Sequence, residues 1–463
     1  MVETQTKNQN IFWLWSNDID FQKRGDTQYW LPIFLENENA VSKFSKLTDW
    51  VELKGGATPL GSNYVEHGIP FLRIQNIGEN ELILDEVVYI SEATHEGLLK
   101  RSQLKVGDVL FTITGRIGSV AVVPDEMKTG NINQHIVRMR IRDRNKLLPY
   151  YLSTYLLTKY AKLQHERVAY GTTRIALDYP TLYNLKVFVP PLQDQQKVEQ
   201  IVKEALQLKK EAETDYQKSQ QLLNEALGLS GVEKKQELTF WRWSDEVDIV
   251  ARIDPNYYQR YFQEMQTRRA KMKTTELEKL ASLIDYGTVP TSPDAPPELG
   301  IPYLTGKNIQ PNELVLEKLD YLYTDTTQSI KDKAIKAGDV LITQMGTVGN
   351  AAVMGKKQEG WFFGSFLIRV RPNKDVFPEW LALVINSDFG KQQIQQAMTT
   401  ATVRTNTDLP TIKGLEIPMI DKKKEKEIVD LYIQSRSKKT LSKQKLQEAK
   451  DFVDDLVQKS NIN

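Results

Sequence analysis

The sequence predicts an α+β protein in which two similar mixed α/β globules are joined by two long helices that pair as a coiled coil. Three observations lead to this prediction. A repeat runs through the whole chain, each copy alternates short β-rich runs with Gly, Pro and Asn, and each copy ends in a long segment without Gly or Pro. Periodicity that changes in this way within a duplicated unit indicates a globular part followed by a helix.

The repeat is clearest in two pairs of segments. GIPFLRIQNI at 68–77 returns as GIPYLTGKNI at 300–309, and VGDVLFTITGRIGSVAVV at 106–123 returns as AGDVLITQMGTVGNAAVM at 337–354. The copies lie 228 to 232 residues apart, a drift that small loop insertions would produce. One module has therefore been duplicated. Shorter matches share the spacing: FWLWS at 12–16 with FWRWS at 240–244, and Arg174, Asp178, Pro180 and Leu185 with Arg404, Asp408, Pro410 and Leu415.

Strands and short helices are expected in each module up to about residues 190 and 418. DVLFTI (108–113) and DVLITQ (339–344) predict buried strands that begin after a Gly-Asp turn. The segments 148–165 and 377–397 have helical spacing and a Pro near the first turn. Each half is therefore expected to be a mixed α/β globule.

Two long amphipathic helices are expected after VPPL (189–192) and after IPMID (417–421). At 1.5 Å per residue each is about 50 Å long, and one such helix does not bury its apolar stripe alone. We expect the two helices to pair as a coiled coil. As an alternative, each packs back on its own globule, and the irregular seam would also accept a helix from another protein. The expected seam residues are Val198, Ile201, Ala205, Leu208, Ala212, Leu222, Ile428, Leu431, Ala449, Phe452 and Leu456.

These patterns predict four segments. They are a globule at 1–190, a helix at 191–232, a second globule at 233–418 and a second helix at 419–463.

Composition excludes several classes of protein. The 61 Lys and Arg residues nearly cancel the 60 Asp and Glu residues, so a site for a polyanion would have to be a local concentration of basic groups. Cysteine is absent, which excludes disulfides and thiolate chemistry and suits a reducing compartment. We find neither a signal-peptide pattern nor an apolar run of about 20 residues. A cytoplasmic location is therefore expected.

No set of catalytic groups is recognisable in the sequence. GKN at 306–308 lacks the rest of a phosphate-binding loop, and the Gly-x-x-Gly turns at 115–118 and 346–349 do not open a helix. The histidines lack metal-ligand spacing. We expect no enzyme activity and no metal or cofactor bound by this chain. The histidines are His67, His95, His135 and His165.

Polar replacements between the copies indicate a recognition site. The shared positions are mainly Gly, Pro, Asp and aliphatic residues, which set the common frame of the two copies. By contrast, RIQN in the first copy is replaced by TGKN in the second, and TITGR is replaced by TQMGT. The exchanged side chains are types that hydrogen-bond base edges and phosphates. In VRMRIRDRNK (137–146), four alternating arginines would share one face of a strand. That stripe would contact DNA, or alternatively remain solvated or pair with nearby acids.

With these features in view, the chain resembles a specificity subunit of a type I restriction–modification system. The resemblance lies in the paired frames, the two GDVL strands with their Gly-x-x-Gly turns, RIDPNYY (252–258), VPPLQDQQKVEQIV (189–202), and the order globule, helix, globule, helix. It implies two target-recognition domains with pseudo-two-fold symmetry, each reading half of a split, asymmetric DNA site. It also implies an antiparallel helical spacer that docks two methyltransferase subunits.

The resemblance also assigns the chemistry to partners. S-adenosylmethionine and the methylation of adenine would belong to the methyltransferase subunits. ATP and Mg²⁺ would belong to the partners as well, with ATP used by a restriction/translocase subunit.

Candidate DNA contacts are the polar residues that flank the repeated frames. Arg174 and Arg404, kept in both copies after a Thr-rich loop, are the strongest candidates. The full set is Lys54, Thr58, Arg73, Gln75, Asn76, Thr114, Arg116, Asn133, Gln134, Arg138, Arg140, Thr172, Thr173, Arg174, Tyr286, Thr288, Thr305, Lys307, Asn308, Gln344, Thr347, Thr400, Arg404 and Asn406.

Two other functions stay open from the sequence. One is a coiled-coil scaffold that joins two protein-binding globules without DNA. The other is a self-sufficient DNA-modifying enzyme whose motifs are unrecognised.

Overall fold

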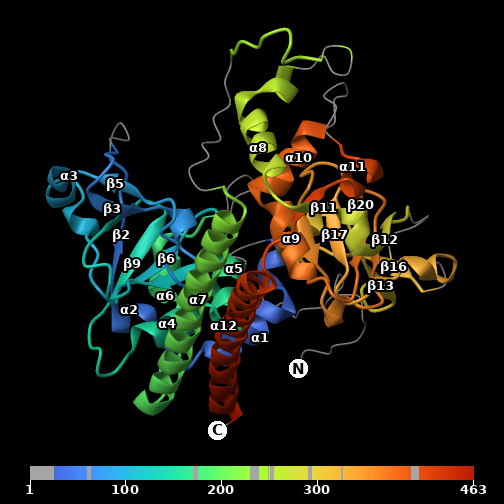
Figure 1. Ribbon diagram of the computed structural model, residues 1–463. Helices are drawn as coiled ribbons and strands as arrows, with labels where there is room; N and C mark the ends of the chain where they lie inside the picture. Colours follow the sequence, from blue (N-terminus) through green and yellow to red (C-terminus); the bar gives the residue numbers. More distant parts are fainter. Residues whose placement is uncertain are drawn as a thin grey trace. The chain divides into compact units, whose positions relative to one another are not determined.

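The computed structural model describes residues 26–59, 64–169, 176–229, 239–248, 250, 255–289, 295–324, 327–397 and 406–462. The chain divides into two compact units. Unit 1 comprises residues 1–210 and 438–463, and unit 2 comprises residues 211–437. Each unit combines sheets and short helices with parts of two long helices, α7 (Leu192–Ala226) and α12 (Lys422–Ile462) (Figure 1). The predicted α+β class is confirmed.

Unit 1 is built on a five-stranded sheet of order β2-β9-β6-β7-β4 and a three-stranded sheet of order β5-β3-β8. β1 pairs with β10 separately. Its strands are β1 (Ser45–Lys46), β2 (Val51–Gly55), β3 (Ile69–Leu72), β4 (Glu79–Asn80), β5 (Val88–Ile90), β6 (Val109–Thr112), β7 (Val120–Val122), β8 (Asn131–Ile132), β9 (Ile136–Ile141) and β10 (Lys186–Val187). Its helices before α7 are η2 (Thr27–Trp30), α1 (Pro32–Val41), α2 (Leu47–Trp50), η4 (Ile74–Asn76), α3 (Glu92–Glu96), η5 (Lys100–Ser102), α4 (Pro149–Leu156), α5 (Lys159–Val168) and α6 (Tyr179–Asn184).

Unit 2 repeats this topology. The order β12-β20-β17-β18 corresponds to β2-β9-β6-β7, and β16-β13-β19 corresponds to β5-β3-β8. Its strands are β11 (Thr274–Glu276), β12 (Ala281–Tyr286), β13 (Gly300–Leu304), β14 (Ile309–Gln310), β15 (Glu313–Leu314), β16 (Asp320–Tyr323), β17 (Val340–Thr343), β18 (Ala351–Val353), β19 (Phe362–Phe363), β20 (Leu367–Pro372) and β21 (Glu416–Pro418). Its helices before α12 are η6 (Pro255–Tyr258), α8 (Arg260–Ala270), η7 (Leu277–Leu280), η8 (Gly306–Asn308), η9 (Gln328–Lys333), η10 (Lys356–Gln358), α9 (Pro378–Asn386), α10 (Asp388–Ala397) and α11 (Leu409–Lys413).

The strands predicted from DVLFTI and DVLITQ form as β6 and β17, and every residue of both strands is buried. Each predicted helical segment forms two helices, α4 with α5 and α9 with α10. The breaks fall at Thr158 and Ser387, whose backbones are extended. Their hydroxyls donate to the carbonyl oxygens of Tyr155 and Val384, at 2.7 and 2.6 Å. A side chain that hydrogen-bonds the preceding turn competes with helix continuation.

The long helices contribute to the core of each unit. In unit 1, Val198 of α7 and Val453 of α12 are fully buried with Tyr151 and Tyr155 of α4. In unit 2, Leu223 of α7 and Tyr432 of α12 are buried in the main core. Helix pairing and packing on the globules, which the sequence left as alternatives, therefore occur together.

Within each unit, α7 and α12 run antiparallel. In unit 2 the Ser435 hydroxyl donates to the Ala212 carbonyl at 2.7 Å, and the Ser219 hydroxyl donates to the Ile428 carbonyl at 2.9 Å. In unit 1 the Ser442 hydroxyl donates to the Ala205 carbonyl at 2.6 Å. Moving seven residues forward on α7 thus corresponds to moving seven back on α12. Small residues at these positions allow the two backbones to approach closely.

Candidate nucleic-acid interface

In unit 1 three loops of the repeated frame meet beside the sheets. The Gly56 amide donates to the Ile136 carbonyl at 3.1 Å, and the Ile113 amide donates to the His135 carbonyl at 2.9 Å. These bonds join the end of β2, the β6–β7 turn and the β8–β9 turn. Gly56 has no room for a side chain, because a Cβ there would collide with the Ile132 and Asn133 carbonyls. The backbone that follows β2 is therefore in direct contact with the backbone of the β8–β9 turn.

Unit 2 has the same arrangement, bond for bond. The Gly287 amide donates to the Leu367 carbonyl at 3.1 Å, and the Gln344 amide donates to the Phe366 carbonyl at 2.8 Å. Each of these four residues lies 231 positions after its counterpart in unit 1. A Cβ on Gly287 would collide with the Phe363 and Gly364 carbonyls. The two copies therefore share one backbone frame at these loops.

The side chains carried by this frame differ. In unit 1 the Thr114 hydroxyl lies 2.6 Å from Nδ1 of His135, and the Thr58 hydroxyl is hydrogen-bonded to the Gln134 amide oxygen. In unit 2 the equivalent positions are Met345, Phe366, Val289 and Ser365. His135, Val289, Met345 and Phe366 are absent from the candidates drawn from the sequence. Comparing the copies at a constant offset of 231 would have found them.

The asparagine kept in both frames has a structural role. The Asn76 side chain accepts from the Arg73 amide at 2.8 Å and donates to the Ile83 carbonyl at 2.8 Å. Asn308 does the same with the Thr305 amide and the Val315 carbonyl, both at 2.9 Å. Both asparagines are 1% exposed. They fix the turns at η4 and η8, which explains why the frame retains them.

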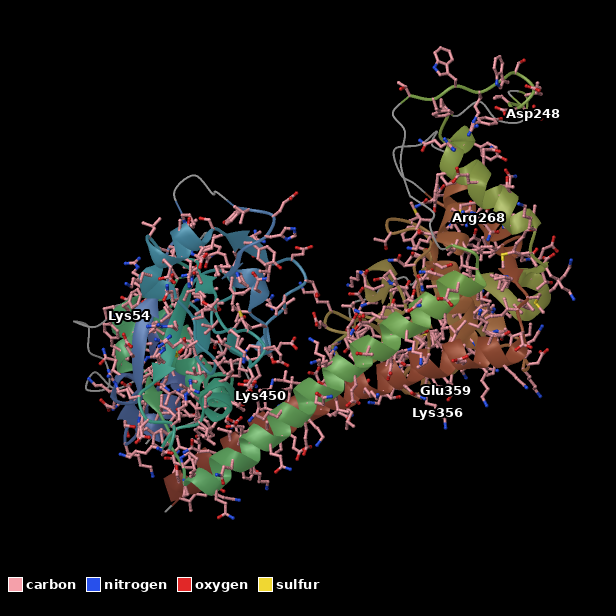
Figure 2. The ribbon with its side chains drawn as sticks, turned by 60° about the vertical axis from the view of Figure 1, so that its left-hand side comes forward. Lys54, Asp248, Arg268, Lys356, Glu359 and Lys450 are labelled. Carbon is pink, nitrogen blue, oxygen red and sulfur yellow. The ribbon has the colours of Figure 1, made fainter. Side chains whose placement is uncertain are left out.

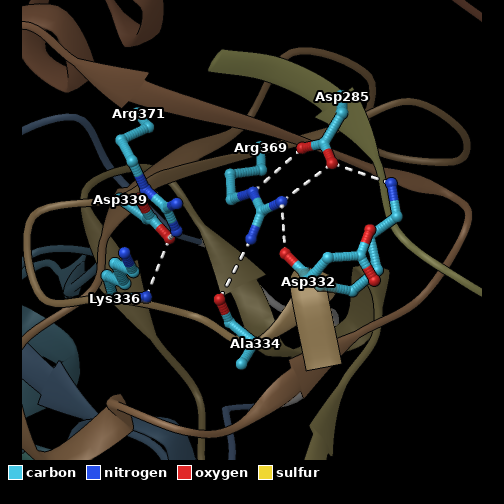
Figure 3. Close-up of polar contacts among 8 residues, drawn as sticks. Asp285, Asp332, Ala334, Lys336, Asp339, Arg369 and Arg371 are labelled. Carbon is cyan, nitrogen blue, oxygen red and sulfur yellow. Dashed lines mark hydrogen bonds and ion pairs between the residues drawn. The ribbon is translucent and has the colours of Figure 1, made fainter. Parts of the chain in front are cut away.

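The arginines of β9 and β20 are held by the protein. Arg140 pairs with the buried Asp108 through Nε and Nη2 at 2.8 and 2.7 Å, and Arg371 pairs with Asp339 at 2.7 Å through the same two nitrogens. Arg369 contacts both carboxylate oxygens of Asp285, at 2.9 and 2.8 Å (Figure 3). The carboxylate hydrogen bonds raise the pKa of Arg140 and of Arg371. The ion-pair alternative therefore applies to these side chains.

Arg138 is 5% exposed and donates to the Gln103 carbonyl at 3.0 Å, as Arg140 does at 3.3 Å. Burial lowers the pKa of Arg138. The two arginines share one face of β9 as predicted, but that face is turned into the domain. The expected stripe of four also ends early, because β9 stops at Ile141.

The remaining candidates fall into three groups. Lys54 on β2 is exposed (Figure 2). It lies 3.7 Å from a Glu52 oxygen, and the exposed Lys307 pairs with Asp320 at 2.8 Å. The other exposed candidates are Gln75, Arg116, Gln134, Thr347 and Asn406. Partly buried candidates are Thr58, Arg73, Thr114, Tyr286, Thr288, Thr305 and Gln344, and Asn133 is 8% exposed. Thr172, Thr173, Arg174, Thr400 and Arg404 lie outside the described residues.

The expected helix seam is partly displaced. Val198, Ile201, Ala205, Ala212, Ile428 and Ala449 are buried, whereas Leu208, Leu222, Leu431, Phe452 and Leu456 are partly buried. Val202, Leu223, Tyr432, Val453 and Val457 are buried although the heptad pattern did not mark them. These residues also pack on the globules, a contact that a two-helix pattern does not contain.

Within the described residues, no group of three His, Asp or Glu side chains could hold a metal ion. None of the helices described there has a stretch sufficiently long and apolar to span a membrane.

Comparison with known proteins agrees with a duplicated module. The family model described as type I restriction modification DNA specificity domain matches residues 40–223 and 271–451. The type I restriction enzyme MjaVIII specificity subunit of Methanocaldococcus jannaschii is 23% identical over 205 residues, or 42% of this chain. The match spans 47% of that relative's length, about half.

One solved structure shows a similar fold. The S subunit of a type I restriction-modification system from M. genitalium aligns over 90% of this chain and 94% of its own, with 11% identity and a TM-score of 0.50. The HsdS subunit from Thermoanaerobacter tengcongensis aligns over 90% of this chain and 95% of its own, with 16% identity and a TM-score of 0.29.

Two copies of one α+β frame, with different side chains on equivalent loops, define a protein of paired recognition modules. The family match covers most of both copies. The chain belongs to the family of type I restriction–modification DNA specificity domains.

Proposed function

We propose that this chain is the non-catalytic specificity subunit of a type I restriction–modification complex, in which each unit reads one half of a bipartite, asymmetric sequence in double-stranded DNA. One observation carries the proposal: the loop backbones match bond for bond at a constant offset, while Thr58, Thr114 and His135 become Val289, Met345 and Phe366. A kept frame suits two modules that meet the duplex in the same way. Changed side chains suit different half-sites, since base contacts specify sequence.

The paired helices would set the distance between the half-sites and dock two methyltransferase subunits. Support comes from two shallow, open hollows at equivalent places, each formed almost wholly by one face of a long helix. One lies along α7 and includes Gln217 and Gln221, and the other lies along α12 and includes Gln447 and Asp451. Each α12 residue follows its α7 counterpart by 230 positions. Two polar helix faces at equivalent places suit two copies of one partner.

The chemistry would reside in the partners. Methyltransferase subunits would bind S-adenosylmethionine, and restriction/translocase subunits would use ATP and Mg²⁺. This chain would bind none of these cofactors.

Methylation sequencing of a host that expresses this chain with its neighbouring methyltransferase gene tests the proposal. We expect a bipartite methylated motif, one half of which changes when residues 1–190 are exchanged for those of another family member. An unchanged motif after the exchange would contradict the assignment of one half-site to each unit. A host without the methyltransferase gene is the control and should show no methylation.

A second measurement separates the proposal from the enzyme alternative. The purified chain alone is incubated with DNA, Mg²⁺ and S-adenosylmethionine. Methylation or cleavage by the lone chain would refute a non-catalytic role. Absence of a methylated motif, with the complex assembled, would instead favour the scaffold alternative.

A further inference from the structure

Four equivalent loop positions differ in chemical character between the two units. In unit 1 they hold Thr58, Thr114, Gln134 and His135, and in unit 2, each 231 residues later, they hold Val289, Met345, Ser365 and Phe366. Three of the four positions change from polar to apolar. The loops keep the same backbone bonds, so the positions are equivalent in structure as well as in number.

In unit 1 these residues form a hydrogen-bonding surface. The Thr114 hydroxyl contacts Nδ1 of His135, and Nε2 of Gln134 lies 3.3 Å from Nε2 of His135. Gln134 is exposed, whereas Thr58, Thr114 and His135 are partly buried. Amide, hydroxyl and imidazole groups can donate to and accept from base edges.

In unit 2 the same place is an exposed apolar patch. Phe366 is 55% exposed and Val289 is 75% exposed. The backbone holds them near each other, because the Ser365 amide donates to the Thr288 carbonyl at 3.1 Å. Met345 adjoins Gln344, whose amide is bonded to the Phe366 carbonyl. An exposed cluster of large apolar side chains on a recognition surface indicates a site for an apolar ligand group.

The apolar group that DNA offers in its major groove is the C5-methyl of thymine. Apart from the small C5 hydrogen of cytosine, the other groups on the base edges there are hydrogen-bond donors or acceptors. The exposed polar residues Thr347 and Asn406 lie on the same group of loops, Thr347 in the β17–β18 turn and Asn406 bridged to Met345. Such a mixture of apolar and polar side chains suits a base edge that combines a methyl group with a carbonyl acceptor.

We propose that unit 2 reads thymine in its half-site through contact of Phe366 and Val289 with the C5-methyl group, whereas unit 1 reads its half-site at the equivalent loops by hydrogen bonds. This inference rests on the proposed function. It adds the chemical class of base edge that unit 2 selects.

Deoxyuridine substitution tests it, because deoxyuridine lacks only the methyl group. The motif comes from methylation sequencing, and the exchange of residues 1–190 assigns the halves. Binding of the assembled methyltransferase complex is then measured by competition with duplexes in which single thymines are replaced. We expect at least one replacement in unit 2's half-site to weaken binding about three- to tenfold, as for loss of a buried methyl contact. Replacements in unit 1's half-site should change binding less than about twofold.

Variants of the chain locate the contact. Phe366→Ala should weaken binding to the thymine duplex by a similar factor and remove the difference between thymine and deoxyuridine. Val289→Ala should reduce that difference. Met419→Ala is the matched control, since Met419 is 41% exposed in unit 2 beyond β21, and the difference should persist. Phe366 is largely exposed, so its replacement should leave the fold intact.

The possible outcomes separate the two proposals. If binding requires the bipartite motif but no deoxyuridine replacement in unit 2's half-site matters, this inference is overturned and the proposed function stands. If unit 2's half-site contains no A·T pair, this inference is likewise overturned and the proposed function stands. If the complex does not prefer the bipartite duplex, the proposed function fails and this inference fails with it.

Discussion

The Ser442 side chain of α12 donates a 2.6 Å hydrogen bond to the Ala205 backbone carbonyl of α7. A side chain as short as serine reaches a facing helix's backbone only if the two helices lie very close. Ser442 is 2% exposed and Ala205 is fully buried. Close approach through small residues is therefore the basis of this part of the helix pair, where a leucine-rich seam would hold the helices further apart.

The first prediction follows from this contact. Ser442→Leu should lower the free energy of unfolding by about 1–3 kcal/mol, because extra methylene groups have no room in a tight seam. Ser437→Leu is the matched control, since Ser437 lies on the same helix and is exposed. Chemical denaturation of both variants measures the effect. Equal stability of the two would show that the seam is loose.

A second prediction concerns the buried carboxylate beneath β20. Asp339 is 1% exposed, pairs with Arg371 and accepts from the Lys336 amide at 2.8 Å (Figure 3). Asp339→Ala should lower the free energy of unfolding by about 3 kcal/mol, because it leaves the Arg371 guanidinium group and the Lys336 backbone amide without their acceptor. The exposed Asp375→Ala is the control. A loss of DNA affinity without a loss of stability would mean that Arg371 contacts DNA.

The arginine pairs show what could be predicted from the sequence and what could not. Alternation placed Arg138 and Arg140 on one face, and both do contact the Gln103 carbonyl. Alternation does not reveal which face is covered, and here the covering segment comes from elsewhere in the chain. The duplication revealed the shared frame, but the role of Asn76 depends on the Ile83 carbonyl, a contact that the repeat alone does not specify.

A third prediction concerns pH. His165 is 3% exposed beside Phe111, and its ring nitrogens have no hydrogen-bond partner among the described residues. Burial, with a smaller effect of Lys162, lowers the pKa of His165 from 6.5 to about 4. The unfolded chain therefore takes up a proton below pH 6.5 that the folded chain takes up only near pH 4. The histidine should reduce stability as the pH falls through this window, by about 3 kcal/mol in total.

His165→Ile should remove that loss. Unit 2 already carries an isoleucine, Ile394, at the equivalent position beside the equivalent glycine. A Cβ on Gly349 would lie 2.8 Å from the Ile394 side chain, just as one on Gly118 would lie 2.8 Å from the His165 ring. Denaturation of the variant and the original chain at pH 7 and pH 4 gives the difference. His67→Ile, at an exposed histidine, is the control. Parallel pH profiles for the original chain and His165→Ile would contradict a neutral, buried imidazole.

The last prediction concerns the proposed role of the helices in setting the distance between half-sites. The bonded pairs Ala205 with Ser442, Ala212 with Ser435 and Ser219 with Ile428 recur every seven residues on both helices. Deleting residues 206–212 together with 436–442 would bring Ala205 opposite Ser435 and leave Ser219 opposite Ile428. The seam would keep its register while each helix loses one heptad. Seven residues correspond to about 10 Å of helix, or about three base pairs.

The double deletion should therefore shorten the gap in the methylated motif by about three base pairs without changing either half-site. Deleting 206–212 alone is the control. It shortens only one of the two helices, so the Ala205–Ser442 and Ser219–Ile428 pairs can no longer form together. This single deletion should prevent assembly with the methyltransferase. Methylation sequencing measures the gap, and native mass spectrometry measures assembly. An assembled double-deletion complex that methylates the original motif would show that the helices do not determine the distance. Altered half-sites would instead mean that the deletion disturbs the loops around Thr114 and Met345.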